Sequence, residues 1–326
     1  MNPVIRIRAL KEADLDEADR ISRIAFGTFL GLLDPGTFYG DADFVRTRFR
    51  ADPSLSLAAE MYGQLVGSNF VANWGSVGFF GPLTVRPDLW DKGIGKNLLN
   101  KTLEIFERLG TKHIGLFTFS HSPKHIHFYQ KYDFWPRFLT NVMSKPVGSA
   151  SKTKEQEAPT PTNWFKYSDV PHDRKSTILG NCSSLTNSIY KGLDLRNEIV
   201  SITTQKLGEV ILLKANAKND LGGLAVCHCG PRTEAGSGTC YVKFGMAANE
   251  GQSAPDNFDH LLEACECYAA SQGLVTLLAG VNIGNLGAYR RMISKGFKTE
   301  YQGVMMTKNN DPGYHKEDVY AIDDWR

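Results

Sequence analysis

The stretch LTVRPDLWDKGIGKNLL, residues 83–99, decides the fold of this chain. It leads from strand-forming residues into an amphipathic helix, and it places Gly93 and Gly95 one residue apart between Lys92 and Lys96. Glycines let backbone N–H groups converge on a ligand, and the first turn of a helix offers unpaired N–H groups at the positive end of its dipole. The stretch therefore predicts an anion site at the start of the helix.

Two familiar phosphate motifs do not fit these residues. A nucleotide P-loop needs the spacing G-x-x-x-x-G-K-[ST], and DKGIGKN lacks both that spacing and a hydroxyl residue after Lys96. A dinucleotide fingerprint needs a third glycine, at the position of Leu98, and an acidic residue in a second βαβ unit. Two interpretations stay open: a pyrophosphate on the helix N-terminus, or a plain strand-to-helix turn that uses glycine for its geometry.

Hydrophobic patterning predicts an α/β unit around this stretch. The order along residues 4–144 is strand, helix, three strand-like runs, glycine stretch, helix, strand, short helix and final strand. Residues 113–120, HIGLFTFS, are apolar on both faces, as expected of a strand that is covered on both sides. The helix after the glycines ends at Gly110 and carries an apolar stripe. The stripe consists of Leu98, Leu99, Thr102, Leu103, Phe106 and Leu109.

Residues 147–162 are poor in apolar side chains and rich in Ser, Thr, Lys, Glu and Pro. This composition predicts an exposed linker between one domain at residues 1–146 and another at residues 163–326. The second domain repeats the order meander, helix, strand, helix and strand with little sequence identity. A tandem duplication of one α/β unit explains the repetition.

The composition is that of a soluble globular protein, because 42% of the 326 residues are hydrophobic and 22% are charged. The net charge of +2 and the absence of a basic block give no support for a nucleic-acid partner. No apolar run is long enough to cross a bilayer, and the N-terminus lacks the pattern of a signal or transit peptide. We expect a cytoplasmic protein without a membrane partner, and the sequence does not fix its oligomeric state.

All six cysteines lie in the second half, and four of them form C-x-C pairs. Cys227 and Cys229 would share one face of a strand. Cys265 and Cys267 fall in a helical pattern, where residues two apart point about 200° apart and cannot chelate one metal without unwinding. We therefore expect buried free thiols and no metal site.

The first half resembles the GNAT superfamily of N-acyltransferases. The family pattern [QR]-x-x-G-x-[GA] is met by WDKGIG, with Trp90 where Gln or Arg is usual. The later pattern Y-x-K-x-G-F is met by YQKYDF, with Asp133 where glycine is usual. The resemblance covers residues 4–145 well and reaches the second half mainly through NIGNLGAYRRMISKGF. It implies an α/β fold of two tandem GNAT-like domains, each a mixed, mostly antiparallel sheet flanked by helices.

The same resemblance implies acetyl-CoA, or a related acyl-CoA, as co-substrate. In the family the CoA pyrophosphate lies on the glycine loop, and the pantetheine arm pairs with the backbone of the preceding strand, much as an added β-strand would. The implied acceptor is a primary amine of a small molecule, a peptide or a protein. The implied cofactor-binding residues are Leu83, Thr84, Val85, Trp90, Asp91, Lys92, Gly93, Ile94, Gly95 and Lys96.

The catalytic residues follow less directly. Tyr129 matches the family tyrosine that protonates the departing thiolate, and a phenol of pKa ~10 can donate to a thiolate whose acid has a pKa of roughly 8.5. No titratable group lies in VGFFGPLTV, so His121 is the candidate base and a water chain is the alternative. Ser122 stands where the family usually has Asn. The acceptor pocket is expected to draw on aromatic side chains at Phe29, Phe38, Tyr39 and Trp74, and the alternative is that these side chains belong to the core.

The second half does not keep the features of the first. The loop NEGQSAPD retains one glycine and places Glu250 near the expected pyrophosphate, a repulsion of about 1 kcal/mol or more at close range. Met292 falls at the position of the tyrosine acid. We therefore expect a degenerate second copy and an N-acetyltransferase that is active in its first domain. The alternative is a non-catalytic acyl-CoA-binding or scaffold protein.

Overall fold

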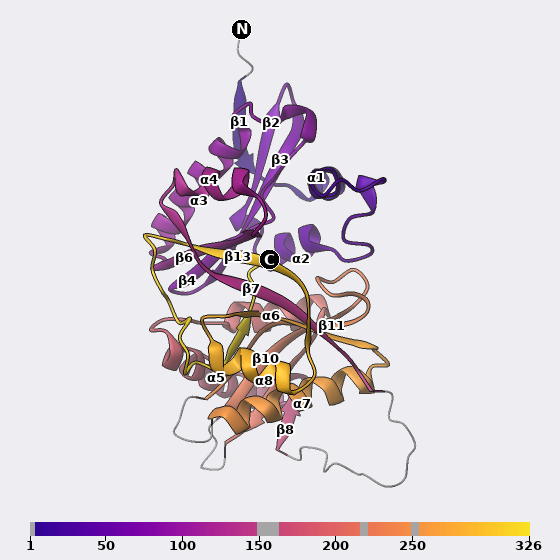
Figure 1. Cartoon of the computed structure of the whole chain (residues 1–326), viewed down its shortest axis with the longest axis vertical. Coiled ribbons are helices and arrows are strands. Elements are labelled where there is room, and N and C mark those ends of the chain that lie inside the picture. Colours follow the sequence, from indigo (N-terminus) through magenta and orange to yellow (C-terminus); the bar gives the residue numbers. More distant parts are fainter. Residues whose placement is uncertain (1–3, 149–162, 216–220, 249–253) are drawn as a thin grey trace.

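The computed structural model describes residues 4–148, 163–215, 221–248 and 254–326, and Figure 1 shows two α/β halves that share one sheet. The first half has the strands β1 (Ile5–Ala9), β2 (Ser56–Met61), β3 (Gln64–Trp74), β4 (Val77–Phe80), β5 (Thr84–Val85), β6 (His113–Phe119) and β7 (Phe134–Pro146). Its helices are α1 (Leu15–Phe29), α2 (Phe44–Ala51), α3 (Ile94–Leu109) and α4 (Pro123–Gln130).

The second half repeats this order. Its strands are β8 (Trp164–Lys166), β9 (Gly208–Lys214), β10 (Leu221–Gly230), β11 (Gly236–Ala247), β12 (Thr276–Asn282), β13 (Lys298–Lys308) and β14 (Ala321–Asp323). Its helices are α5 (Lys175–Ile189), α6 (Arg196–Gln205), α7 (Ala254–Ser271) and α8 (Leu286–Ser294). The predicted mixed α/β architecture is confirmed. Most of the predicted linker and the loop around Glu250 lie outside the described residues.

The two halves exchange their closing strands. The sheet runs β1-β2-β3-β4-β6-β13-β7-β12-β11-β10-β9-β8, so β13 of the second half lies between β6 and β7 of the first. In return, β7 of the first half pairs with the whole of β12 in the second half, from Thr276 to Asn282. Figure 1 shows the late strand β13 among the early strands β4, β6 and β7. Each half therefore supplies a strand that the other half needs.

Helices cover both faces of the first half. The residues of β2 alternate, so Leu57 and Ala59 pack under α3 and α4, whereas Ala58 packs under α1 and α2. The stripe on α3 is buried as predicted, except that Leu103 is half-buried and Leu109 is exposed. Gly110 ends this helix in a left-handed conformation with φ of 69°, which a glycine adopts without strain.

The sheet of the first half opens beyond Phe79. The parallel pairing of β4 with β6 ends at Phe79 and Gly115, and β5 then pairs with β3 alone. Within the described part of the chain, no strand lies on the other side of β5. We call this place, where β5 and the end of β6 are not paired with each other, the slot; Gly81–Val85 and Phe119–Ser122 border it.

The corresponding gap in the second half is filled. The parallel pairing of β11 with β12 ends at Val242 and Ala279. Directly beyond it, β14 pairs antiparallel with Phe244–Met246 and also lies beside β12. The chain's own late segment thus occupies the place that is open in the first half.

Candidate active site

The glycine loop has the geometry of an anion site. Gly93 is the N-cap of α3 with φ of 81°, and a Cβ placed there would meet no atom within 4 Å. The first N–H groups of α3 lie at the positive end of a helix of 16 residues, next to this open position. Lys92 and Lys96 are exposed on either side. This arrangement fits the pyrophosphate of CoA.

Trp90 connects the glycine loop to β5. Its indole N–H donates to the Val85 carbonyl at 2.8 Å, and the Lys124 ammonium lies 5.8 Å from its ring centroid. Lys124 also forms an ion pair with Asp91 at 2.9 Å. Although Gln or Arg is usual in the family at position 90, the tryptophan ties β5 to the turn that carries Gly93.

Tyr129 lies on α4, on the same face of the sheet as α3. Its ring packs edge-on against Phe80 and Phe134, with centroids 5.9 and 6.5 Å away. Burial raises the pKa of its phenol well above the usual range, so the hydroxyl stays protonated at neutral pH. No described residue forms a hydrogen bond with this hydroxyl, which leaves it available to a ligand.

The two departures from the family pattern next to Tyr129 keep the local geometry. Asp133 has φ of 65°, the left-handed conformation that the usual glycine would adopt, and its carboxylate accepts a hydrogen bond from the Trp135 indole at 2.7 Å. Ser122 is the N-cap of α4, and its hydroxyl accepts from the His125 N–H at 3.3 Å. Both substitutions therefore preserve the end and the start of α4.

His121 lies on the other side of the sheet, toward α1. It is exposed, and its ring stacks on Phe29 at 5.9 Å and lies 5.5 Å from Phe119. His125 also packs on Phe29, at 4.7 Å, and burial with the nearby Lys124 lowers its pKa. The two predicted catalytic residues thus border the slot from opposite faces.

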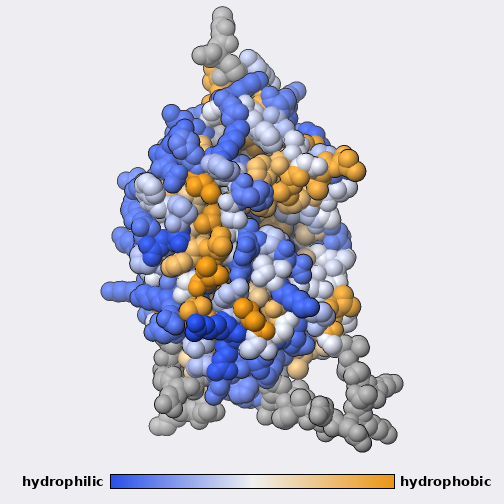
Figure 2. Space-filling view, in the orientation of Figure 1, coloured by the Kyte–Doolittle hydropathy of each residue, from blue (hydrophilic) through white to orange (hydrophobic). Residues whose placement is uncertain are grey.

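A group of half-buried rings forms one continuous wall on the α1 side. Phe26 contacts Phe38, Tyr39 and Phe119 at centroid distances of 5.4 to 6.0 Å, and Phe29 stacks on Phe119 at 5.4 Å. We call these five rings the aromatic wall. Figure 2 shows apolar surface continuing over the loop after α1, where Leu30, Leu32 and Leu33 are exposed.

Trp74 does not belong to this wall, so its predicted place in the acceptor pocket is wrong. The side chain is 1% exposed, packs against Phe79 and Phe244, and donates to Glu198 at 3.2 Å. The alternating pattern of a strand marks a tryptophan as inward-facing, but it does not distinguish a pocket from a core.

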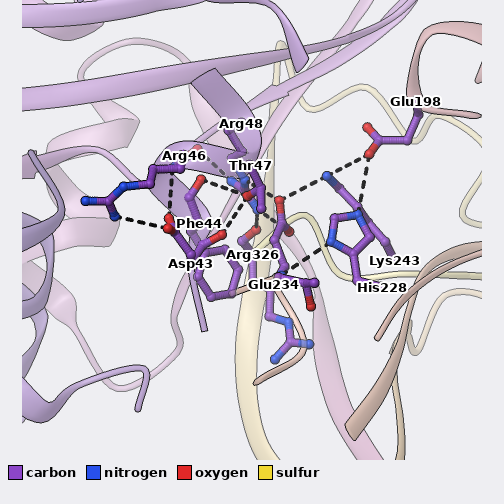
Figure 3. Close-up of polar contacts among 12 residues, drawn as sticks. Asp43, Phe44, Arg46, Thr47, Arg48, Glu198, His228, Glu234, Lys243 and Arg326 are labelled. Atoms are coloured by element: carbon purple, nitrogen blue, oxygen red, sulfur yellow. Dashed lines mark hydrogen bonds and ion pairs between the residues drawn. The ribbon is translucent and has the colours of Figure 1, made fainter. Parts of the chain in front are cut away.

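A buried ionic network connects the two halves next to Gly81, and the sequence did not predict it (Figure 3). Arg48 binds Glu234 through two hydrogen bonds of 3.0 and 3.1 Å, and Lys243 binds Glu234 at 3.0 Å and Glu198 at 2.9 Å. The nearby cations hold the pKa of Glu234 far below its usual range and lower that of Glu198 to about 2, despite burial. Both carboxylates are therefore stabilised in the ionised form and balance the buried cations.

The segment after β14 brings the second half against Arg48 of the first half. Figure 1 shows the C-terminus in the middle of the molecule, between the two halves. Arg326 lies over the ring of Tyr241 at 4.0 Å and donates to the Tyr301 hydroxyl at 3.0 Å. Its carbonyl accepts a hydrogen bond from Arg48. The second half therefore contacts Arg48, which itself donates to the Gly81 carbonyl at the edge of the slot.

Comparisons with known proteins concern the first half of the chain by sequence and the whole chain by structure. Residues 21–134 match the model of the family described as Acetyltransferase (GNAT) family. The match lies within the first half of the chain and stops before the second half.

Solved structures show the fold of the whole chain. A candidate acetyltransferase from Pyrococcus horikoshii is 14% identical, with a TM-score of 0.65 over 98% of this chain and 95% of its own. A GCN5-related N-acetyltransferase from Sphaerobacter thermophilus is 13% identical, with a TM-score of 0.57 over 95% of this chain and 96% of its own. A tandem GNAT protein from the clavulanic acid biosynthesis pathway is 11% identical, with a TM-score of 0.59 over 95% and 99%. The chain thus has the tandem GNAT fold.

A search of curated protein sequences gives no significant match. In the described ranges no cluster of three or more potential metal ligands occurs, and no helix is long and apolar enough to span a membrane.

Proposed function

We propose that this protein is an N-acetyltransferase that moves an acetyl group from acetyl-CoA to a primary amine of a small molecule or peptide, with the reaction in its first half. The contrast between the two slots carries the proposal. In the first half the slot is open beside the glycine loop and Tyr129, whereas in the second half β14 fills it. Met292, at the position of Tyr129, is fully buried in the second core.

Each part of the site has a separate task. The N-terminus of α3 with Lys92 and Lys96 would hold the pyrophosphate, and the free edge of β5 would align the pantetheine arm. Acetyl-CoA supplies the activated thioester. The aromatic wall offers apolar surface for the acceptor on the opposite face, so that the amine and the thioester meet in the slot.

Tyr129 would supply the proton in the transfer. The amine nitrogen forms a bond to the carbonyl carbon, and the carbon–sulfur bond then breaks. The Tyr129 hydroxyl protonates the departing thiolate, and the nitrogen releases one proton to His121 or to water. Tyr129 regains its proton from solvent, so the site returns to its starting state.

A non-catalytic acyl-CoA-binding protein is the second candidate. One observation favours it: the buried carboxylates Glu234 and Glu198 are bound to cations, so neither is a free base.

The test measures release of free thiol from acetyl-CoA with a panel of amines. We expect at least one amine to raise the rate, and a Tyr129→Phe variant to lose about 100-fold in kcat while it still binds acetyl-CoA. Tyr132→Phe is the matched control, because Tyr132 packs on the same Phe128 ring but lies beyond the end of α4. Binding without turnover on any amine would favour the second candidate, and equal rates in both variants would remove Tyr129 from the mechanism.

A further inference from the structure

Arg48 joins three segments that are far apart in the sequence. Its guanidinium donates to both carboxylate oxygens of Glu234, to the carbonyl of Gly81 at 2.6 Å, and to the carbonyl of Arg326. The rings of Phe44 and Phe79 flank it at 5.3 and 5.9 Å. The side chain is therefore fixed in one orientation by partners in both halves (Figure 3).

Gly81 lies where the first sheet opens. Its N–H donates to the carbonyl of Phe70 in β3 at 2.8 Å, so Gly81 is still hydrogen-bonded to the sheet on one side. Pairing with β6 has already ended at Phe79, and the carbonyl of Gly81 is held by Arg48 instead. Because Leu83–Val85 follow directly, the direction of this peptide determines the path of the slot edge.

The second half provides the charge that holds Arg48 in place. Glu234 is fully buried, and it shares its charge between Arg48 and Lys243. Glu198 binds Lys243 at 2.9 Å and lies 3.8 Å from the His228 ring, so both buried carboxylates have partners in the network. A buried guanidinium needs such a partner, because an unpaired charge in the interior is strongly unfavourable. The orientation of Arg48 therefore depends on residues outside the half that carries the slot.

We propose that the second half, having lost its own slot, acts as the positioning unit of the first. Glu234 and the Arg326 carbonyl orient Arg48, and Arg48 orients the Gly81 peptide, which sets the edge of the slot on which the thioester lies. Glu234 and Arg48 are positioning residues, because neither reaches the reacting atoms. This inference rests on the proposed function.

The test uses Glu234→Gln in the full chain, with [1-13C]acetyl-CoA as the probe. The glycine loop is untouched, so we expect the Kd for acetyl-CoA to change less than about threefold. The 13C signal of the bound thioester carbonyl is expected to move away from its wild-type position, and kcat on an accepted amine to fall about 100-fold, as for a misplaced reacting group. Arg48→Lys keeps the positive charge but loses the forked geometry, so it is expected to show the same changes.

Glu209→Gln is the matched control, because Glu209 is a buried carboxylate of the second half that binds Ser168 and makes no contact with Arg48. We expect Glu209→Gln to lower the melting temperature about as much as Glu234→Gln does, but to keep the wild-type carbonyl signal and kcat. If Glu234→Gln does not fold, Arg48→Lys decides the matter by the same two readouts. An unchanged carbonyl signal and kcat in the folded variants would overturn the positioning role. Failure of the wild type to bind acetyl-CoA would instead contradict the proposed function.

Discussion

The rings of Trp325 and Phe79 stack in parallel, with centroids 5.7 Å apart and an angle of 1° between their planes. Phe79 is the last residue of β4 that pairs with β6, and Trp325 follows the strand that fills the second slot. The indole also occupies the space above Gly115, where an added Cβ would come within 2.2 Å of the ring. One segment thus fills the slot of the second half and also packs against Phe79 and Gly115, where the pairing of β4 with β6 ends.

Replacing Trp325 by Ala should destabilise the protein strongly. The side chain is 2% exposed, so its removal leaves a large cavity between the halves, and we expect a loss of about 3–5 kcal/mol in the free energy of unfolding. Urea denaturation measures this loss. Trp135→Ala is the comparison, because Trp135 is 42% exposed and should cost about 1 kcal/mol or less. Equal losses in the two variants would show that Trp325 does not hold the halves together.

The strand exchange predicts that the first half does not fold alone. Without β13, both β6 and β7 lose a neighbouring strand, and an apolar sheet edge is exposed. A fragment of residues 1–148 is expected to show no cooperative thermal transition. Adding residues 163–326 as a separate chain should restore the transition and give a stable one-to-one complex on gel filtration. A sharp transition in the isolated fragment would contradict the role of β13.

The buried carboxyl of Asp323 should make stability depend on pH. Burial raises its pKa to about 7, and it accepts a hydrogen bond from the Tyr314 hydroxyl. The unfolded carboxyl has a pKa of about 3.9, so between about pH 4 and pH 7 the folded state binds more protons than the unfolded state. Asp323 therefore contributes most to the free energy of unfolding below about pH 4. Its contribution falls steadily between about pH 4 and pH 7, by at most about 1.4 kcal/mol per pH unit.

Asp323→Asn should remove this part of the pH dependence. Urea denaturation at pH 5, 6 and 7 measures it, with Asp318→Asn as the control, because that residue is exposed and undergoes the same change in charge. We expect the slope of unfolding free energy against pH to rise toward zero or above in Asp323→Asn alone. Parallel slopes in all three proteins would mean that Asp323 ionises normally in the folded state.

Local features of this chain could be predicted from its sequence. The glycine loop, the helix from Ile94 to its end at Gly110, and the short helix that carries Tyr129 depend on neighbouring residues and on periodicity. The placement of Trp74 could not be predicted, because a buried aromatic residue on a strand fits a core and a pocket equally well. Here tertiary packing, not local pattern, decides.

The contacts that join the two halves are not predicted by any local pattern in the sequence. Arg48 occurs in RTRFR, which resembles a solvated basic helix, and Glu234 occurs in a turn that is rich in small residues. Their pairing spans 186 residues of sequence, and no spacing rule connects them. The exchange of β7 and β13 is equally hidden, because either strand would complete its own domain by pattern alone. The sequence of β14 also does not reveal that it fills a slot.

A calorimetric titration of acetyl-CoA tests the central claim most directly. The wild type is expected to bind one molecule per chain, and Gly93→Glu to bind none, because a carboxylate would then stand beside the pyrophosphate. Gly110→Glu is the matched control: it lies at the other end of the same helix, also has a positive φ, and also has open space where a Cβ would be. One site in the wild type and in Gly110→Glu, lost only in Gly93→Glu, is the predicted result. Two sites per chain, or undiminished binding by Gly93→Glu, would contradict a single acetyl-CoA site on the first half.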